Sequence, residues 1–203
     1  MQITIIGTGN MGRGIAASAL GGGHSVTLLG REPGKAEQVA AELDGQVATA
    51  SVGDPLSGDI VVLALHYGVA AEVARQYGDQ LDGKILVDIE NPVDFSTFEP
   101  IAVEAGSAAQ ELAAAVPGAR VVKAFNTTFA GTLAVGQPLD VFIASDDDDA
   151  KAAVSQIVTD AGLHAVDVGP LRRARELEGM GYLHMVITQG TDAPFATAMK
   201  VVS

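Results

Sequence analysis

The sequence contains no cysteine among its 203 residues. This absence excludes a disulfide framework, a thiolate zinc site and a cysteine nucleophile, so redox chemistry has to come from a bound cofactor. Basic residues are scarce as well: 12 lysines and arginines stand against 25 aspartates and glutamates, for a net charge of −13. That charge has the wrong sign for binding the phosphates of nucleic acid, which we do not expect as a partner.

Long apolar runs are also absent, which argues against a membrane-spanning helix and a membrane partner, while an apolar content of 48% excludes a disordered chain. The N-terminus runs from Met1 into Gly7 without the basic segment and cleavage site of a signal peptide. We therefore expect a cytoplasmic globular protein. The length suits one domain, and no linker rich in proline, glycine and serine divides residues 1–203.

Short aliphatic runs alternate with segments that have helical spacing. The clearest run, Ile60 to Leu65, is apolar at consecutive positions, as in a parallel strand that is covered on both faces. The alternation predicts an α/β fold with a doubly wound parallel sheet of the Rossmann type, extended by a C-terminal helix and strand. The irregular stretch 89–105 is predicted to be a functional loop. We expect strands over residues 2–6, 25–29, 46–50, 60–65, 84–88, 121–124, 140–144, 164–167 and 196–202, and helices over 11–20, 35–43, 69–77, 107–116, 147–161 and 171–188.

A glycine-rich turn follows the first predicted strand and opens the first predicted helix. It fits the pattern G-x-G-x-x-G, in which the glycines allow a tight turn, the close approach of a pyrophosphate and tight packing of the helix on the strand. A turn without a ligand is the alternative, which the order of strand, turn, helix and second strand disfavours. We expect a dinucleotide to bind at Gly7, Thr8, Gly9, Asn10, Met11 and Gly12.

The end of the second predicted strand favours NADP(H) over NAD(H). An NAD enzyme usually presents an acidic residue there to the ribose hydroxyls, whereas this chain reads Gly30-Arg31. The guanidinium of Arg31 can bind a 2′-phosphate, and Lys35 can add charge one helical turn later. Glu32 lies near the position of the NAD acidic residue and is evidence against this interpretation. Arg31 and Lys35 as ordinary solvated residues are the alternative.

Polar and aromatic residues follow the fourth, fifth and sixth predicted strands, at the edge of the sheet where ligands of such folds bind. Together they can hold a flat ring by stacking and hydrogen bonds. No triad of nucleophile, base and acid is recognisable, so we assign no catalytic residue, and His66 serving to cap its strand is an equal alternative. The candidate binding residues after these strands are Leu65, His66, Tyr67, Asn91, Asn126 and Thr127.

Other polar clusters have structural explanations. Asp146 to Asp149 precedes a predicted helix and is expected to cap it rather than to bind a metal. Arg172 and Arg175 are spaced to pair with Glu176 and Glu178 along a helix, a contact with an anionic coenzyme being the alternative. Lys123, inside an apolar run, is assigned only an edge or strand-end position.

Stretches along nearly the whole chain carry a family resemblance. They are Ile5 to Gly12, Gly23-His24, Gly30-Arg31 with Lys35, Asn91-Pro92, Gly106 to Ala109, Lys123 to Phe129, Val166 to Leu171 and Arg172 to Glu178. Through them the chain resembles the NADPH:coenzyme F420 oxidoreductases, or F420-dependent NADP reductases, and within them a short bacterial branch of dinucleotide-binding oxidoreductases. The cytosolic reductase domain of six-transmembrane metalloreductases is similar too.

The resemblance implies hydride transfer between the nicotinamide C4 of NADP(H) and C5 of coenzyme F420, with both rings in one cleft of a homodimeric enzyme. The stretches around His66 and Asn126 would then face the second ring. Gly30 departs from the serine of the deazaflavin reductases, which leaves flavins, quinones or ferric chelates as alternative acceptors. By the same resemblance, the NADP-binding residues would be Thr8, Asn10, Met11, Arg31 and Lys35.

Two further interpretations stay open. Pyrroline-5-carboxylate reductases share the opening glycine pattern, but they add a helical dimerisation domain for which a chain that ends at Ser203 is expected to have little room. A non-catalytic NADP sensor is the other alternative, disfavoured by the predicted second pocket.

Overall fold

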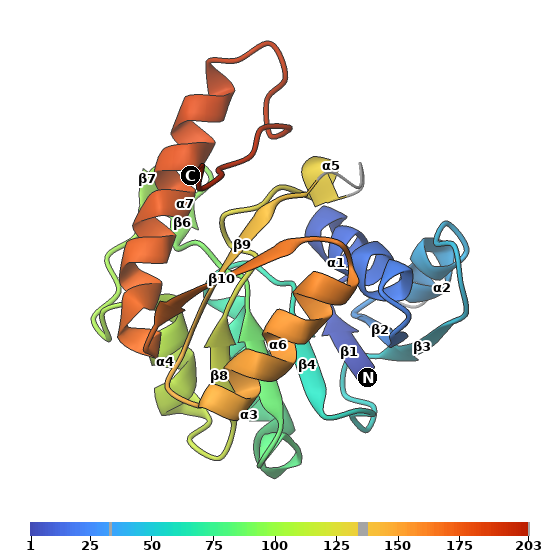
Figure 1. Ribbon diagram of the computed structural model, residues 1–203. Coiled ribbons are helices and arrows are strands. Elements are labelled where there is room, and N and C mark those ends of the chain that lie inside the picture. Colours follow the sequence, from blue (N-terminus) through green and yellow to red (C-terminus); the bar gives the residue numbers. More distant parts are fainter. Residues whose placement is uncertain (33, 134–137, 203) are drawn as a thin grey trace.

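The computed structural model describes residues 1–32, 34–133 and 138–202. Its main sheet has eight strands, namely β1 (Gln2–Ile6), β2 (Ser25–Gly30), β3 (Val47–Ser51), β4 (Ile60–Leu63), β5 (Ile85–Asp88), β8 (Arg120–Lys123), β9 (Asp140–Ser145) and β10 (His164–Gly169). They lie in the order β10-β9-β8-β5-β4-β1-β2-β3 (Figure 1). From β1 the chain adds β2 and β3 on one side, and from β4 it adds β5 and β8 on the other, so the strand order reverses between β1 and β4. Ligands of this fold class bind at such a reversal.

The sheet confirms the predicted doubly wound α/β architecture, with one difference in strand direction. Every neighbouring pair is parallel except β8 and β9, which run antiparallel through Val122 opposite Ser145. In the described residues between these two strands, the chain carries the short helix α5 (Ala130–Leu133), which is shorter than the usual helical crossover that returns a parallel strand.

Helices cover both faces of the sheet, because its central strands are apolar on both faces. One apolar core packs α1, α2, α5 and α6 against the sheet, and the opposite core packs α3, α4 and the start of α7. The helices are α1 (Asn10–Gly21), α2 (Lys35–Ala40), α3 (Val69–Tyr77), α4 (Ala108–Ala115), α5 (Ala130–Leu133), α6 (Asp148–Asp160) and α7 (Ala174–Gln189), with 3-10 turns η1 (Gly78–Leu81) and η2 (Leu171–Arg173).

Two local predictions are wrong. Residues 196–202 form no strand; the segment is held instead by the backbone N–H of Val201, which donates to Asp140 Oδ2 at 2.6 Å. The stretch 89–105 is not wholly irregular, because β6 (Val93–Asp94) and β7 (Glu99–Pro100) pair as a small antiparallel hairpin.

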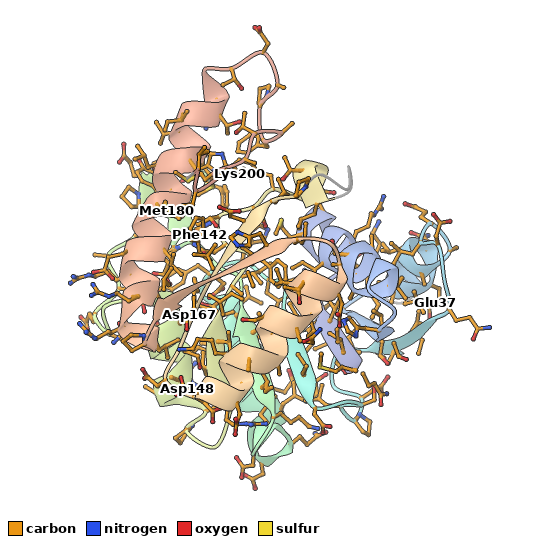
Figure 2. All side chains as sticks on the ribbon, in the orientation of Figure 1. Glu37, Phe142, Asp148, Asp167, Met180 and Lys200 are labelled. Carbon is orange, nitrogen blue, oxygen red and sulfur yellow. The ribbon has the colours of Figure 1, made fainter. Side chains whose placement is uncertain are left out.

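The C-terminal segment returns alongside α7 at one side of the molecule (Figure 1). Phe142 of β9, Met180 of α7 and Lys200 of the returning segment line an apolar groove between them (Figure 2). None of the helices within the described ranges combines the length and the apolar character that crossing a membrane would require.

Candidate active site

The turn between β1 and α1 is shaped by its glycines. Gly7 has a φ of +124°, which favours glycine, and a Cβ there would collide with the carbonyl of Ala64. A Cβ on Gly12 would collide in turn with the carbonyl of Gly7. Gly9 is the N-cap of α1 and no side chain caps the helix, so the first backbone N–H groups are free to bind an anion.

A first cavity of about 280 Å³ opens beside this turn. Arg31 and Lys35, both exposed, lie at its edge together with Glu32. Within the described part of the chain, neither Arg31 nor Lys35 forms an ion pair, so both cations are available to a phosphate. The other lining residues are Gly7, Thr8, Gly9, Val52, Ala64, Leu65, His66, Val69 and Val73.

A second cavity of about 330 Å³ continues from the first across the carboxyl ends of β4, β5 and β8. The two cavities share Gly9, Ala64, Leu65 and His66, so they form one groove along the edge where the strand order reverses. The second cavity is lined further by Asn10, Met11, Tyr67, Ile89, Glu90, Asn91, Phe95, Phe125, Asn126, Thr128, Phe129 and Met185.

The groove brings most of the candidate residues from the sequence together, with two exceptions. Gly12 and Thr127 line neither cavity; Gly12 packs α1 on β1, and the Thr127 side chain is buried behind the wall. Sequence reasoning missed Phe95, from the hairpin, and Met185, from α7. Neither follows a strand of the main sheet, so the strand-end rule gives no signal for them.

Two asparagines that form the floor of the second cavity are hydrogen-bonded to each other. Asn91 Nδ2 donates to the carbonyl of Asn126 at 2.7 Å, and Asn126 Nδ2 donates to Asn91 Oδ1 at 2.9 Å and to the carbonyl of Leu177 at 2.8 Å. Gly181 of α7 packs against this pair, where a Cβ would clash with both residues. The asparagines therefore join the ends of β5 and β8 to α7, and Asn126 Oδ1 is buried with no hydrogen-bond partner in the part of the chain that the structure describes.

Aromatic rings border the mouth of the second cavity. His66 and Phe95 lie edge to face, with ring centroids 5.4 Å apart. The ring centroids of Phe129 and the buried His184 are 4.5 Å apart. Tyr67 donates a hydrogen bond to Glu111 Oε2 at 2.9 Å, and burial together with this carboxylate raises the pKa of Tyr67 to about 12. The phenol is therefore neutral at physiological pH.

Lys123 lies at the end of β8, as one of the two expected positions, but it is completely buried beneath the second cavity. Its Nζ contacts Asp88 Oδ2 and Glu178 Oε1, each at 2.8 Å, and the main-chain carbonyl of Glu90 at 2.6 Å. Burial opposes the charge of Lys123, yet the two carboxylates hold its pKa above the ordinary lysine value. Burial, and then the charge of Asp88, raises the pKa of the Glu90 carboxyl to about 8.

The other predictions about polar residues had different outcomes. Asp147 caps α6, accepting from the Ala150 N–H at 2.7 Å. The predicted pairing of Arg175 with Glu178 is wrong, because Glu178 points into the core while Arg175 contacts Glu176 at 3.0 Å. Arg172 makes no ion pair with Glu176 in the described residues. Over the same residues, no group of three or more histidines and acidic residues is arranged to hold a metal ion.

The residues present fit a dinucleotide with a 2′-phosphate. The uncapped start of α1 can bind a pyrophosphate, and Arg31 and Lys35 can bind a further phosphate at the other end of the first cavity. Buried polar atoms without a partner, Asn126 Oδ1 and Glu90 Oε1, belong to residues of the second cavity and can be satisfied by a polar ring.

Comparison with known proteins agrees with this geometry. A family model described as "NADP oxidoreductase coenzyme F420-dependent" matches residues 2–92, which include both cavities' shared wall. The F420-dependent NADP reductase of Methanothermobacter thermautotrophicus is 31% identical over 197 residues, covering 88% of this chain and 85% of the reductase.

Two other matches extend along the chain. Metalloreductase STEAP3 of Rattus norvegicus is 34% identical over 185 residues, covering 88% of this chain; the match spans only 36% of STEAP3. The crystal structure of a protein from Arthrobacter sp. FB24, proposed to be an F420-dependent NADP reductase, superposes with a TM-score of 0.84 at 28% identity over 99% of both chains.

Proposed function

The chain belongs to the family of F420-dependent NADP reductases, and from this premise we propose that it transfers a hydride between NADP(H) and coenzyme F420. The observation that carries the proposal is the continuous groove. Its first cavity combines a phosphate-binding turn with free cations, and its second is walled by aromatic and amide groups. The two cavities have volumes of about 280 and 330 Å³, close to the lower end of the range for small-molecule sites, which begins at about 300 Å³.

The first cavity would hold the phosphates of NADP(H). Backbone N–H groups at the start of α1 would bind the pyrophosphate, and Arg31 and Lys35 would bind the 2′-phosphate. The shared wall at Leu65 and His66 would separate this half from the ring-binding half. The proposed cofactor-binding residues are Gly7, Thr8, Gly9, Asn10, Met11, Gly12, Arg31, Lys35, Leu65, His66, Tyr67, Asn91, Asn126 and Thr127.

The second cavity would orient two flat rings for direct transfer. NADPH, when bound, supplies the hydride, so the protein contributes position and the exclusion of water. The rigid Asn91 and Asn126 pair forms the floor, while His66 and Phe95 offer ring edges and faces at the mouth. Gly12 and Thr127 would act indirectly, through the packing of α1 and of the cavity wall.

The test is a reduction assay with purified protein. NADPH is mixed with oxidised coenzyme F420, and the loss of deazaflavin absorbance is followed, with NADH as the matched donor and riboflavin phosphate as the matched acceptor. We expect NADPH-dependent bleaching that NADH does not support. Binding of NADPH without reduction of F420 would contradict the proposed acceptor and leave the NADP site standing.

Ferric chelates and flavins form the second candidate class of acceptor. The observation that favours them is the 34% identity to a metalloreductase over most of this chain. The same assay with ferric citrate, with and without added flavin, separates the two candidates. NADPH binding without oxidation by any of these acceptors would favour a sensor that reports NADP occupancy.

A homodimer is also part of the proposal. The outer face of α7 exposes Leu183 and, one helical turn later, Val186 and Ile187, and a second copy of the chain would cover them. Sedimentation velocity tests this: we expect a dimer for the protein and a shift towards monomer for Leu183→Asp, with Glu176→Gln as a control on the same helix. A monomeric wild-type protein would contradict it. A cytoplasmic location stays a prediction.

A further inference from the structure

The side-chain carboxyl group of Glu90 receives no hydrogen bond from the buried Lys123 ammonium, because that ammonium donates all its hydrogens to other acceptors. An ammonium group has three donors. All three of Lys123 are used, by Asp88 Oδ2, by Glu178 Oε1 and by the main-chain carbonyl of Glu90. Lys123 therefore donates to the main chain of Glu90 and not to its side chain, and among the described residues Glu90 Oε1 is buried without a hydrogen-bond partner.

The charge balance around Glu90 disfavours its ionised form. Asp88 and Glu178 already place two carboxylates against the single charge of Lys123, and Glu111 of α4 acts on Glu90 as a further negative charge. Tyr67, whose pKa the charge of Glu90 helps to raise, is neutral and donates a hydrogen bond to Glu111. With only 5% of Glu90 exposed, ionisation would add uncompensated charge to a buried cluster, so the neutral acid persists near pH 7.

A neutral carboxylic acid in the wall of a ring-binding cavity is a proton donor. We propose that Glu90 is a catalytic residue that protonates the acceptor in the second cavity, an inference that rests on the proposed hydride transfer. A hydride passes with its electron pair from NADPH to the acceptor ring, and the Glu90 proton goes to a heteroatom conjugated with the reduced position. NADP⁺, the reduced acceptor and the Glu90 carboxylate remain, and one proton taken up from the bulk solvent then restores the neutral carboxyl group.

This assignment narrows the acceptor class. A deazaflavin, a flavin or a quinone has a ring nitrogen or carbonyl oxygen that takes up the proton when the ring gains a hydride. A ferric chelate gains single electrons and needs no proton at such an atom. Glu90 therefore favours a conjugated ring that accepts two electrons over a ferric chelate.

The free protein provides the first measurement. Infrared spectra of the wild type at neutral pH should contain the carbonyl stretch of a protonated carboxylic acid, which fades as the pH rises through about 8. This band should be reduced in Glu90→Gln and retained in Glu104→Gln, which changes an exposed carboxyl. Because burial also raises the pKa of Glu178, the informative signal is the part of the band that Glu90→Gln removes. A band that is absent, or that survives Glu90→Gln undiminished, would overturn the proposal whatever the activity.

The second measurement is the pH profile of NADPH-dependent acceptor reduction. Wild-type rates should fall above about pH 8, where Glu90 loses its proton. Glu90→Gln should lower the rate at neutral pH by about 10² to 10⁴-fold, remove that fall and leave NADPH affinity unchanged. Glu111→Gln, which removes a neighbouring negative charge, should shift the fall to lower pH.

The outcomes separate the two proposals. Reduction of the acceptor that is unaffected by Glu90→Gln in rate and pH profile would overturn the role of Glu90 while the proposed function stands. Absence of reduction by the wild type with F420, flavin and quinone would overturn the proposed function, and the role of Glu90 with it. Failure of Glu90→Gln to bind NADPH would show that Glu90 holds the fold rather than the proton.

Discussion

Replacing Lys123 by methionine should destabilise the protein strongly. The side chain is completely buried, and its removal leaves Asp88, also fully buried, and Glu178, 6% exposed, without the cation they share. Breaking one partner out of a buried ion pair costs about 3 to 5 kcal/mol, because the remaining charge is uncompensated. Methionine retains most of the volume, so the loss reports charge more than a cavity.

The hydrogen bonds that Asp88 and Glu178 keep in Lys123→Met place the expected loss of unfolding free energy near the lower end of this range, at about 3 kcal/mol. Asp88 still accepts the Glu90 N–H at 3.0 Å, and Glu178 still accepts the N–H groups of Ala108 and Ala109 at 3.1 and 3.4 Å. These N–H groups belong to the first turn of α4, where the helix dipole favours negative charge.

Urea unfolding at several pH values measures this loss. Burial already raises the pKa of the Glu178 carboxyl, and Lys123 opposes that rise, so in Lys123→Met the folded-state pKa of Glu178 should lie still further above its unfolded value. The folded state then binds more protons than the unfolded state above pH 4, so the stability of the variant relative to wild type should fall as the pH rises towards 8. Adding Glu178→Gln to Lys123→Met should recover part of the loss.

Lys151→Met is the matched control. Lys151 contacts Asp148 at 3.2 Å and Asp167 at 3.3 Å, but both carboxylates are solvent-exposed at the surface of α6 and β10 (Figure 2). Exposed ion pairs contribute about 0 to 1 kcal/mol. A loss below about 1 kcal/mol for Lys123→Met, or equal losses for the two lysines, would refute the argument from buried charge.

Two further predictions concern the cofactor and pH. Arg31→Ala should weaken NADPH binding by about 1 to 3 kcal/mol and hardly change NADH binding, while Arg13→Ala, outside both cavities, should change neither; calorimetric titration that finds equal losses for both cofactors would contradict the 2′-phosphate role. Burial lowers the pKa of His184, so below about pH 6.5 the unfolded state binds more protons than the folded state, and the free energy of unfolding should decrease as the pH is lowered. His184→Phe should flatten this part of the plot of unfolding free energy against pH. An unchanged slope would assign the pH dependence to other groups.

The sequence was sufficient to predict the fold and to predict that the glycine turn, Arg31 and Lys35 lie together, as they do at the first cavity. Both depend on local signals: the alternation of apolar runs, and a glycine pattern whose residues lie next to one another along the chain. Even the antiparallel direction of β9 had a signal, because no helix was expected between Lys123 and Asp140, and a parallel return usually needs one. The strand expected at the C-terminus failed because an apolar run alone does not supply a pairing partner.

Glu178 shows why the other half was harder to predict. Its spacing from Arg175 suggested a pair on the helix surface, but Ala174, Glu178, Gly181 and Met185 recur at helical spacing on the buried face of α7. The pattern of that face places Glu178 in the core, where an acid requires a cation. The cation is Lys123, 55 residues away, and no local pattern connects the two.

The two halves of the groove therefore differ in how the chain encodes them. The candidate phosphate-binding residues of the first cavity come from one turn and from the segment that follows β2. The floor of the second cavity depends instead on contacts between residues 35 to 55 positions apart, among them Asn91 with Asn126 and Lys123 with Glu178. A substitution on α7 can change the charge balance around Glu90 without touching the glycine turn. Under the proposed function, separate sets of contacts would hold the donor and the acceptor, so a change of acceptor between related proteins would leave NADP binding in place.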